Sequence, residues 1–162
     1  MSIINLNGDV RCPVGEGEKI ICQCVNDIGA MGSGVALSIM TKWPCVKKAY
    51  SNWHNVGESI ISGAFELGNV QFVKVANGIT VANMIAQHDI ITNTKGIMPL
   101  RYEELEKCLL KVAKKAKEYN ATIHIPYLMG ADRAGGDWSI IEEMIRKEFD
   151  RIEVRIYKYK RI

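Results

Sequence analysis

The chain has 162 residues, of which 48% are hydrophobic and 24% charged, and this suits a globular domain with a sizeable core rather than a disordered chain. Its net charge of +3 is too small for a nucleic-acid-binding surface, although it favours the approach of a phosphate-bearing ligand. We therefore expect a single domain over residues 1–162.

The cysteines and the N-terminal residues indicate the compartment. The five cysteines are odd in number and lack paired C-x-x-C spacing, which argues against a disulfide framework and against a zinc site. Residues 1–9 become polar too soon for a signal peptide, and no run of about 18 apolar residues occurs. We expect a cytoplasmic protein that makes no contact with a membrane.

The first part of the chain passes from strand-like to helical patterning. Residues 3–6 form a short apolar stretch, and residues 20–25 form an apolar run that is typical of a strand buried on both faces. After Gly34 the apolar residues recur with a helical period as far as Trp43. Pro44 then ends this helix and allows a second one to begin.

The rest of the chain alternates strands and helices. Residues 70–75 and 79–85 predict a hairpin across Asn77-Gly78, because both turn residues tolerate positive φ. The later elements are an amphipathic helix at 102–116, a strand at 123–127, a loop at 130–136, a helix at 138–149 and a strand at 152–159. This alternation predicts an α/β fold whose mixed sheet is covered on both faces.

A glycine-rich loop connects the strand at 20–25 to the helix that follows Gly34. Glycines at 29, 32 and 34 let backbone amides approach a ligand, and the helix N-terminus adds unpaired N–H groups and a positive dipole end. The loop fits neither the nucleotide-kinase nor the dinucleotide glycine pattern. Taken alone, it leaves phosphate binding and a plain tight connection as alternatives.

A second glycine loop, at residues 130–136, repeats the order of strand, loop and helix. Loops at the carboxyl ends of strands line the ligand crevice of an open α/β sheet, so both loops are placed to close on one pyrophosphate. A carboxylate such as Asp132 repels an anion there unless it acts as a base, an acid or a hydroxyl acceptor. The alternative is that Asp132 and Arg133 form a surface pair. Asp137 and Ser139 are predicted helix caps, Ser139 having capping-box spacing to Glu142.

Three separated motifs in this order resemble those of the macro domain family: Gly8-Asp9-Val10, the loop from Asn26 to Ala36, and the segment from Gly130 to Trp138. The residues of these motifs are most similar to the branch of ADP-ribose-1″-phosphate phosphatases. They also resemble the branch that removes ADP-ribose from glutamate or DNA bases. The resemblance covers nearly the whole chain. It implies a three-layer α-β-α domain with a central mixed sheet.

The resemblance also implies residue roles. Asp9 would accept a hydrogen bond from the adenine amino group, and the amide of Val10 would contact the ring. Asn26 would lie beside the distal ribose, where Asp132 would activate water or hold the sugar. The phosphates would be enclosed by the remaining ligand-binding positions: Gly32, Ser33, Gly34 and Val35 on one side, and Met129, Gly130, Ala131 and Arg133 on the other. No metal and no cofactor is required.

One departure from the family concerns the mechanism. Relatives that cleave a glycosidic ADP-ribose bond through a covalent intermediate carry a lysine after the central strand, where this chain has Gln87. An amide cannot form a Schiff base, although Asp132 with water could still support hydrolysis. His88 is a reserve candidate for donating a proton, against the commoner case of an exposed histidine without function. Cys24 is assigned to the core, because burial would raise its pKa.

Three functions remain open at this point. The first is an enzyme that hydrolyses ADP-ribose-1″-phosphate to ADP-ribose and phosphate, or that removes ADP-ribose from protein or DNA, with Asp132, Asn26 and His88 as its catalytic candidates. The second is a non-catalytic reader of ADP-ribose, free or attached to a macromolecule. The third is a nucleotide-binding regulatory protein for another diphosphate. Asp132 favours an enzyme, because pure readers often lack an acid in this loop.

Overall fold

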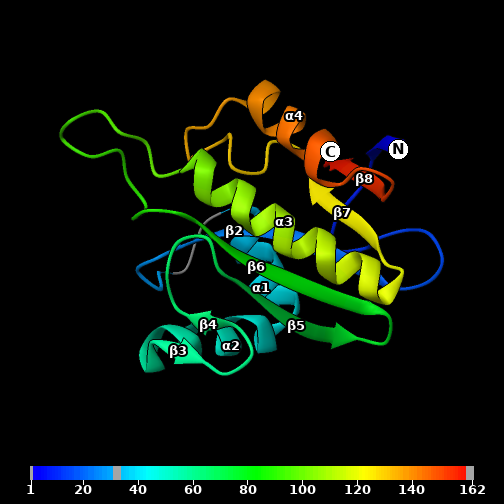
Figure 1. Ribbon diagram of the computed structural model, residues 1–162, viewed down its shortest axis with the longest axis horizontal. Helices are drawn as coiled ribbons and strands as arrows, with labels where there is room; N and C mark the ends of the chain where they lie inside the picture. Colours follow the sequence, from blue (N-terminus) through cyan, green and yellow to red (C-terminus); the bar gives the residue numbers. More distant parts are fainter. Residues whose placement is uncertain (1, 31–33, 160–162) are drawn as a thin grey trace.

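Six strands form one mixed sheet at the centre of the molecule (Figure 1). The computed structural model describes residues 2–30 and 34–159. The strands are β1 (Ser2–Asn7), β2 (Lys19–Asn26), β5 (Val70–Ala76), β6 (Ile79–Gln87), β7 (Thr122–Pro126) and β8 (Glu153–Lys158), in the spatial order β1-β8-β7-β2-β6-β5. Strands β5 and β6 pair antiparallel, and the other neighbours pair parallel.

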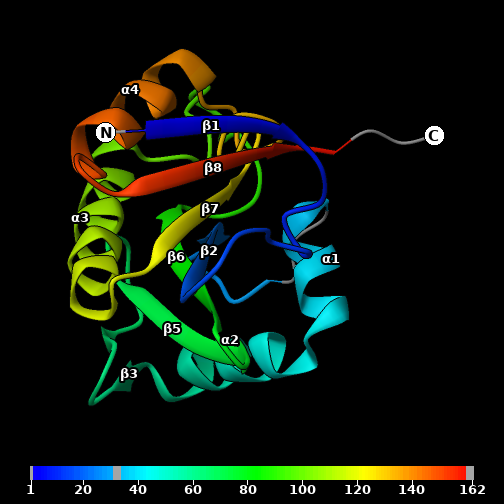
Figure 2. The ribbon, with the colours of Figure 1, turned by 90° about the vertical axis from the view of Figure 1, so that its right-hand side faces the viewer.

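Helices cover both faces of this sheet. Helices α1 (Val35–Lys42) and α2 (Pro44–Val56) lie on one side, and α3 (Tyr102–Tyr119) and α4 (Trp138–Glu148) lie on the other (Figure 2). The predicted α-β-α arrangement with a mixed central sheet is therefore confirmed. No helix in the described ranges is both long and apolar enough to cross a membrane. A separate hairpin of β3 (Glu58–Ser59) and β4 (Gly63–Ala64) was not predicted, because two-residue strands show no alternation.

The alternation of side chains along β2 produces the two halves of the core. Ile20 and Cys22 belong to the buried cluster that packs against α3 and α4. Ile21 and Val25 point to the opposite face and belong to the cluster that includes residues of α1 and α2. The prediction of a strand buried on both faces is thus confirmed, and β2 becomes the central support of the fold.

The start of α4 differs in one detail from the sequence-based expectation. Asp137 is the N-cap, and its side chain accepts a hydrogen bond of 2.9 Å from the backbone N of Ser139. Ser139 lies inside the helix, where its hydroxyl donates to the same carboxylate oxygen. The prediction that Ser139 itself caps the helix is therefore wrong, because the neighbouring carboxylate takes that role.

The order of the strands opens a crevice beside β2. From β2 the chain passes through α1 and α2 to β5 and β6 on one side, and it returns through α3 to β7 on the other side. Strands β2 and β7 pair only from Lys19–Thr122 to Ile21–His124. Their carboxyl ends separate beyond that point, which is where open α/β sheets bind ligands.

A buried histidine on β7 makes folding sensitive to acid. His124 is 0% exposed, and its Nδ1 and Nε2 each lie 2.7 Å from a hydroxyl, of Tyr157 and Thr122 respectively. Burial, together with the positive charges of Arg155 and Lys19, lowers the pKa of His124 from 6.5 to about 3. The folded protein therefore keeps this imidazole neutral while the unfolded chain can protonate it.

We expect acid to reduce the free energy of unfolding through His124. Because its folded pKa is depressed, the unfolded chain binds the extra proton between about pH 6.5 and pH 3, and stability falls as the pH is lowered through that window. From pH 7 to pH 5 the loss should be roughly 2 kcal/mol. Urea denaturation of the wild type and of His124→Gln at both pH values measures it. Equal losses in the two proteins would contradict this assignment.

Candidate functional site

The carboxyl ends of β2 and β7 border a crevice of about 480 Å³. Its walls come from β2, from the start of α1 and from the loop after β7, so the two predicted glycine loops face one space. Seven of the sequence-predicted site residues line it: Asn26, Gly34, Val35, Met129, Gly130, Asp132 and Arg133. Two more, Gly32 and Ser33, lie outside the described residues. The positions Asp9, Val10, Ala131 and His88 are not among the lining residues.

Asn26 ends β2 and holds the first loop in shape. Its Oδ1 accepts hydrogen bonds from the backbone N of Ile28 (3.2 Å) and of Ala30 (3.0 Å), and its Nδ2 donates to the carbonyl O of Ala30 (2.9 Å). The hydroxyl of Tyr50 on α2 lies 2.7 Å from the carbonyl O of Asn26 and 2.9 Å from Oδ1. Burial raises the pKa of Tyr50, so this hydroxyl remains a donor. Asn26 therefore organises the loop, and the second N–H of its amide has no acceptor in the part of the chain that the structure describes.

The first loop ends at an open helix N-terminus. Gly34 is the N-cap of α1 and has a φ of 63°, a conformation that glycine adopts without strain. Among the described residues no side chain caps this helix end, and Gly34, Val35 and Ala36 line the crevice. The first-turn N–H groups and the positive end of the helix dipole are therefore available to an anionic ligand.

The second loop follows β7 and carries an unusual backbone conformation. Leu128 lines the crevice with a φ of 67°, in the left-handed region that non-glycine residues rarely adopt. The loop is closed by hydrogen bonds from the backbone N of Gly136 to Gly130 O (2.9 Å) and of Leu100 to Ala134 O (3.1 Å). Its shape is therefore determined by backbone bonds, and Asp132 and Arg133 are exposed at its crevice side.

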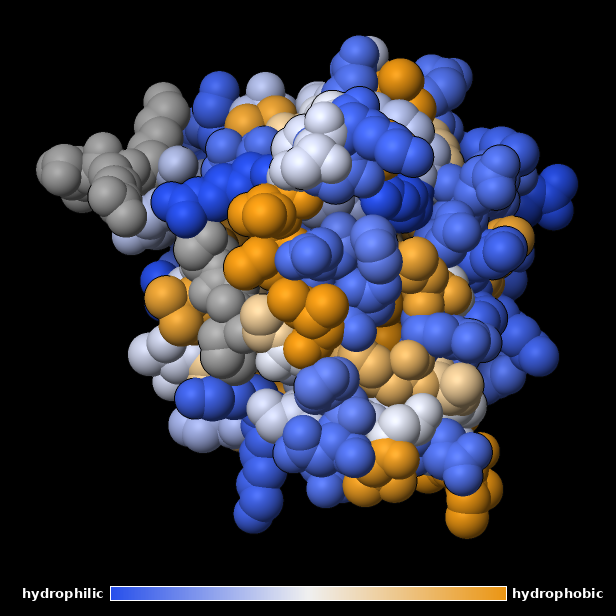
Figure 3. Space-filling model, turned by 90° about the vertical axis from the view of Figure 1, so that its left-hand side faces the viewer, coloured by the Kyte–Doolittle hydropathy of each residue, from blue (hydrophilic) through white to orange (hydrophobic). Residues whose placement is uncertain are grey.

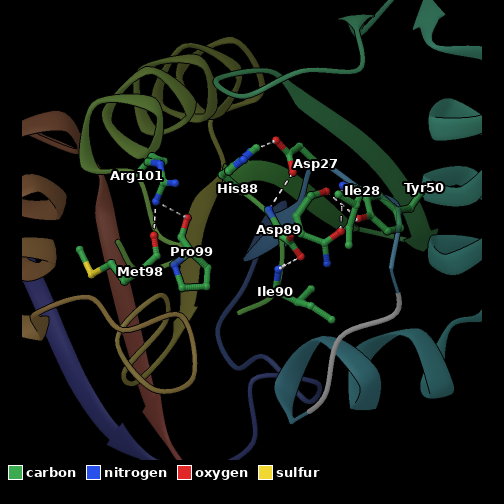
Figure 4. Close-up of polar contacts among 10 residues, drawn as sticks. Asp27, Ile28, Tyr50, His88, Asp89, Ile90, Met98, Pro99 and Arg101 are labelled. Carbon is green, nitrogen blue, oxygen red and sulfur yellow. Dashed lines mark hydrogen bonds and ion pairs between the residues drawn. The ribbon is translucent and has the colours of Figure 1, made fainter. Parts of the chain in front are cut away.

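His88 forms a separate polar cluster at the ends of β2 and β6 (Figure 4). Its Nδ1 lies 2.7 Å from Oδ2 of Asp27, whose Oδ1 accepts a hydrogen bond of 2.9 Å from the backbone N of Asp89. The His88 side chain is 56% exposed and borders a second, smaller cavity instead of the crevice. Gln87 and Ile90 on either side of this cluster do line the crevice. The cluster thus ties the first loop to the segment after β6.

The carboxylate of Asp9 forms an ion pair with the guanidinium of Arg11. The guanidinium of Arg11 donates from Nη2 to Oδ2 (2.6 Å) and from Nε to Oδ1 (3.0 Å), and the backbone N of Arg11 adds a bond of 2.9 Å to Oδ1. The hydrogen bond from Arg11 lowers the pKa of Asp9 below its usual value. A nucleobase amine at Asp9 would have to share this carboxylate with Arg11. Val10 is buried in the core cluster that also includes Met40, and Met40 lines the crevice.

Cys24 lies in the wall of the crevice, but its environment disfavours nucleophilic chemistry. It packs against the core cluster on the α3 and α4 side, and burial raises the pKa of its thiol. The thiolate is therefore scarce at neutral pH. Among the described residues, no three His, Cys, Asp or Glu side chains gather closely enough to hold a metal ion.

The mouth of the crevice carries exposed apolar side chains. Figure 3 views the molecule from the left-hand side of Figure 1 and shows several hydrophobic patches among hydrophilic residues. Five large apolar residues of the crevice or of the loop after β2 are more than a third exposed: Ile28, Val35, Ile90, Tyr127 and Leu128. Exposed apolar groups beside a cavity are typical of ligand-binding surfaces.

Sequence patterns did not reveal three parts of this site. Tyr50 belongs to the periodic apolar face of α2, so nothing marked it as the partner of Asn26. The pairing of Asp27 with His88 joins residues 61 positions apart. Gln23 was detectable in principle, because a polar side chain inside an apolar strand must find a buried partner or face a cavity.

No protein-family model matches the chain. Among solved structures, a macrodomain protein from Streptomyces coelicolor is 37% identical, with a TM-score of 0.80 over 96% of this chain and 98% of that chain. A protein of unknown function from Bacteroides thetaiotaomicron is 39% identical, with a TM-score of 0.91 over 98% of both chains. A structure of DarTG from Thermosipho africanus in complex with ADP-ribose is 19% identical, with a TM-score of 0.67 over 88% of this chain and 39% of that one, and shows likeness of fold.

Two curated proteins are also similar in sequence. Chromodomain-helicase-DNA-binding protein 1-like is 28% identical over 98% of this chain in Mus musculus and 31% identical over 95% in Danio rerio. The chain spans only 18% and 15% of the length of these relatives. The similarity therefore concerns one region of much larger proteins.

The second loop should tolerate no side chain at Gly136. A Cβ there would lie 2.6 Å from the carbonyl O of Gly130 and 3.0 Å from Cδ1 of Ile141, so Gly136→Ala should lower the free energy of unfolding by about 1–3 kcal/mol. Gly8→Ala is the matched control, because its Cβ would meet only Tyr157 Cδ2 at 3.6 Å and neither glycine has a positive φ. Urea denaturation of both variants checks this, and equal effects would contradict it.

Proposed function

The chain belongs to the macrodomain family, and we propose that its crevice binds ADP-ribose. The observation that carries this proposal is that two glycine loops, one leading into the open N-terminus of α1, border one space of about 480 Å³. Backbone N–H groups and a helix dipole suit a pyrophosphate, and the volume lies within the range of small-ligand sites.

The surroundings of the crevice support the orientation of the ligand. Val10 belongs to the buried cluster that includes Met40 of the crevice wall, and an adenine ring held by Asp9 and Val10 would meet the exposed apolar side chain of Val35. Asn26 lies at the other wall, at the end of β2, and offers its remaining N–H to the distal ribose. The two loops between these ends would enclose the phosphates.

We further propose that the protein hydrolyses ADP-ribose-1″-phosphate to ADP-ribose and inorganic phosphate. Asp132 lines the crevice and is exposed to water, so its carboxylate can take a proton from a water molecule that attacks the 1″-phosphate. The new P–O bond forms as the bond from phosphorus to the ribose oxygen breaks. That oxygen is reprotonated as the product leaves. Asn26 would position the distal ribose during this step.

Two other macrodomain activities compete with this one. Hydrolysis of ADP-ribose from protein or DNA would use the same Asp132 and water, since Gln87 at the crevice wall cannot form a Schiff base. A reader would bind ADP-ribose without turnover. The Asp27–His88 pair lies beside Gln87, and His88 remains a candidate proton donor for whichever group leaves.

The experiment combines calorimetry with ADP-ribose and turnover assays on three substrates: ADP-ribose-1″-phosphate, ADP-ribosylated glutamate peptide and ADP-ribosylated DNA. We expect wild type to bind ADP-ribose and to release phosphate from the first substrate. Asp132→Ala should lose about 10²- to 10⁴-fold in kcat, the range for removal of a general base, while it retains ADP-ribose binding.

Asp150→Ala is the matched control, because Asp150 is an exposed aspartate that follows α4 and does not line the crevice. It should keep both binding and turnover. Binding without turnover of any substrate would overturn the enzymatic proposal in favour of a reader. Turnover of the ADP-ribosylated peptide or DNA alone would mean that the leaving group is the glutamate or the DNA base instead of phosphate. Absence of ADP-ribose binding would overturn the proposed function as a whole.

A further inference from the structure

A row of three amide side chains crosses the sheet on its α1 and α2 face. Gln23 on β2, Asn83 on β6 and Gln71 on β5 are direct neighbours in the strand register. Gln23 Nε2 lies 2.6 Å from Asn83 Oδ1, and Asn83 Nδ2 lies 3.1 Å from Gln71 Oε1. Gln71 Nε2 then donates to the backbone O of Ala49 on α2, at 3.0 Å. The row therefore runs from helix α2 to the strand that borders the crevice.

The carbonyl of Ala49 determines the direction of every bond in this row. A carbonyl oxygen can only accept, so Gln71 must turn its NH₂ group toward α2 and its oxygen toward Asn83. Asn83 must then donate to Gln71 and present its own oxygen to Gln23. Gln23 donates from its NH₂ group to the oxygen of Asn83, and its own Oε1 stands at the end of the row. The free end is thus an acceptor, whichever way each amide would turn in isolation.

This terminal oxygen lacks a partner within the described residues. Gln23 is 2% exposed and lines the crevice, and its Oε1 is buried without a hydrogen bond. The neighbouring strand offers none, because β2 and β7 stop pairing at Ile21–His124 and Pro126, two residues further on, has no N–H group. Leaving a buried acceptor unpaired costs about 1–3 kcal/mol, which a donor arriving from the crevice would recover.

We propose that Gln23 is a specificity-determining residue whose Oε1 accepts a hydrogen bond from an N–H or O–H group of the adenine or of either ribose of the ligand. This inference rests on the proposed binding of ADP-ribose. At neutral pH the pyrophosphate of ADP-ribose has only acceptors, so the amide cannot serve it. The donors are the adenine amine and the ribose hydroxyls. Because Oε1 is buried, the surrounding side chains must shift for the donor to reach it.

Calorimetry with ADP-ribose analogues tests this without altering the protein. One analogue carries hypoxanthine, in which a carbonyl replaces the amine, and the others lack the 2′, 3′, 1″, 2″ or 3″ hydroxyl. We expect at least one analogue to bind wild type about tenfold more weakly than ADP-ribose, the loss of one buried hydrogen bond. In Gln23→Met, ADP-ribose should itself bind about tenfold more weakly, and that analogue should lose nothing further.

Asn52→Met is the matched control, because it removes an exposed amide of α2 that lies outside the row and does not line the crevice. It should keep the discrimination between analogues. Thermal denaturation checks that both variants fold. If Gln23→Met fails to fold, the analogue series on wild type and Asn52→Met decides. Equal binding of all analogues by wild type overturns the inference, as does an equal loss by each analogue in wild type and Gln23→Met. Failure of wild type to bind ADP-ribose at all overturns the proposed function first.

Discussion

The position of β2 between β6 and β7 is the constraint on which the site depends. Parallel pairing on both sides fixes the strand in the centre, while the chain departs to one side and returns on the other. No connection crosses the carboxyl ends of β2 and β7, so these ends diverge and the loops that follow them face each other. The crevice is thus a consequence of chain order, and its chemistry comes from the side chains at the two strand ends.

Helix α2 contributes to the site although only its neighbours border the crevice. Two consecutive residues act in different ways: Tyr50 orients the amide of Asn26, and the carbonyl of Ala49 orients the row that ends at Gln23. The amide groups of Asn26 and Gln23 on β2 are therefore oriented before a ligand arrives. Such preorganisation reduces the ordering cost of binding. A shift of α2 against the sheet would disturb both groups together.

The sequence predicted the fold more fully than the site. Strand and helix periods are local, so β2, the β5–β6 hairpin and α3 could be predicted from their own residues, and the glycine loops could be located from composition. The pairs that tune the site are not local. Gln23 and Asn83 are 60 residues apart, and Tyr50 meets Asn26 across 24. The short-range bond between Asp9 and Arg11 was not predicted either, because the resemblance assigned the Asp9 carboxylate to the adenine amine of the ligand.

The backbone carbonyl of Ala49 orients the amide row, and this limits which substitutions can alter the row in evolution. Replacing Ala49 by any residue compatible with the helix leaves the carbonyl where it is. A mutation that removes Gln71 releases Asn83 and Gln23 from this polarity, but no change of side chain at position 49 reverses it while Gln71 is present. The residue type at position 49 therefore carries no signal of this role, although the backbone there determines what the far end of the row can recognise.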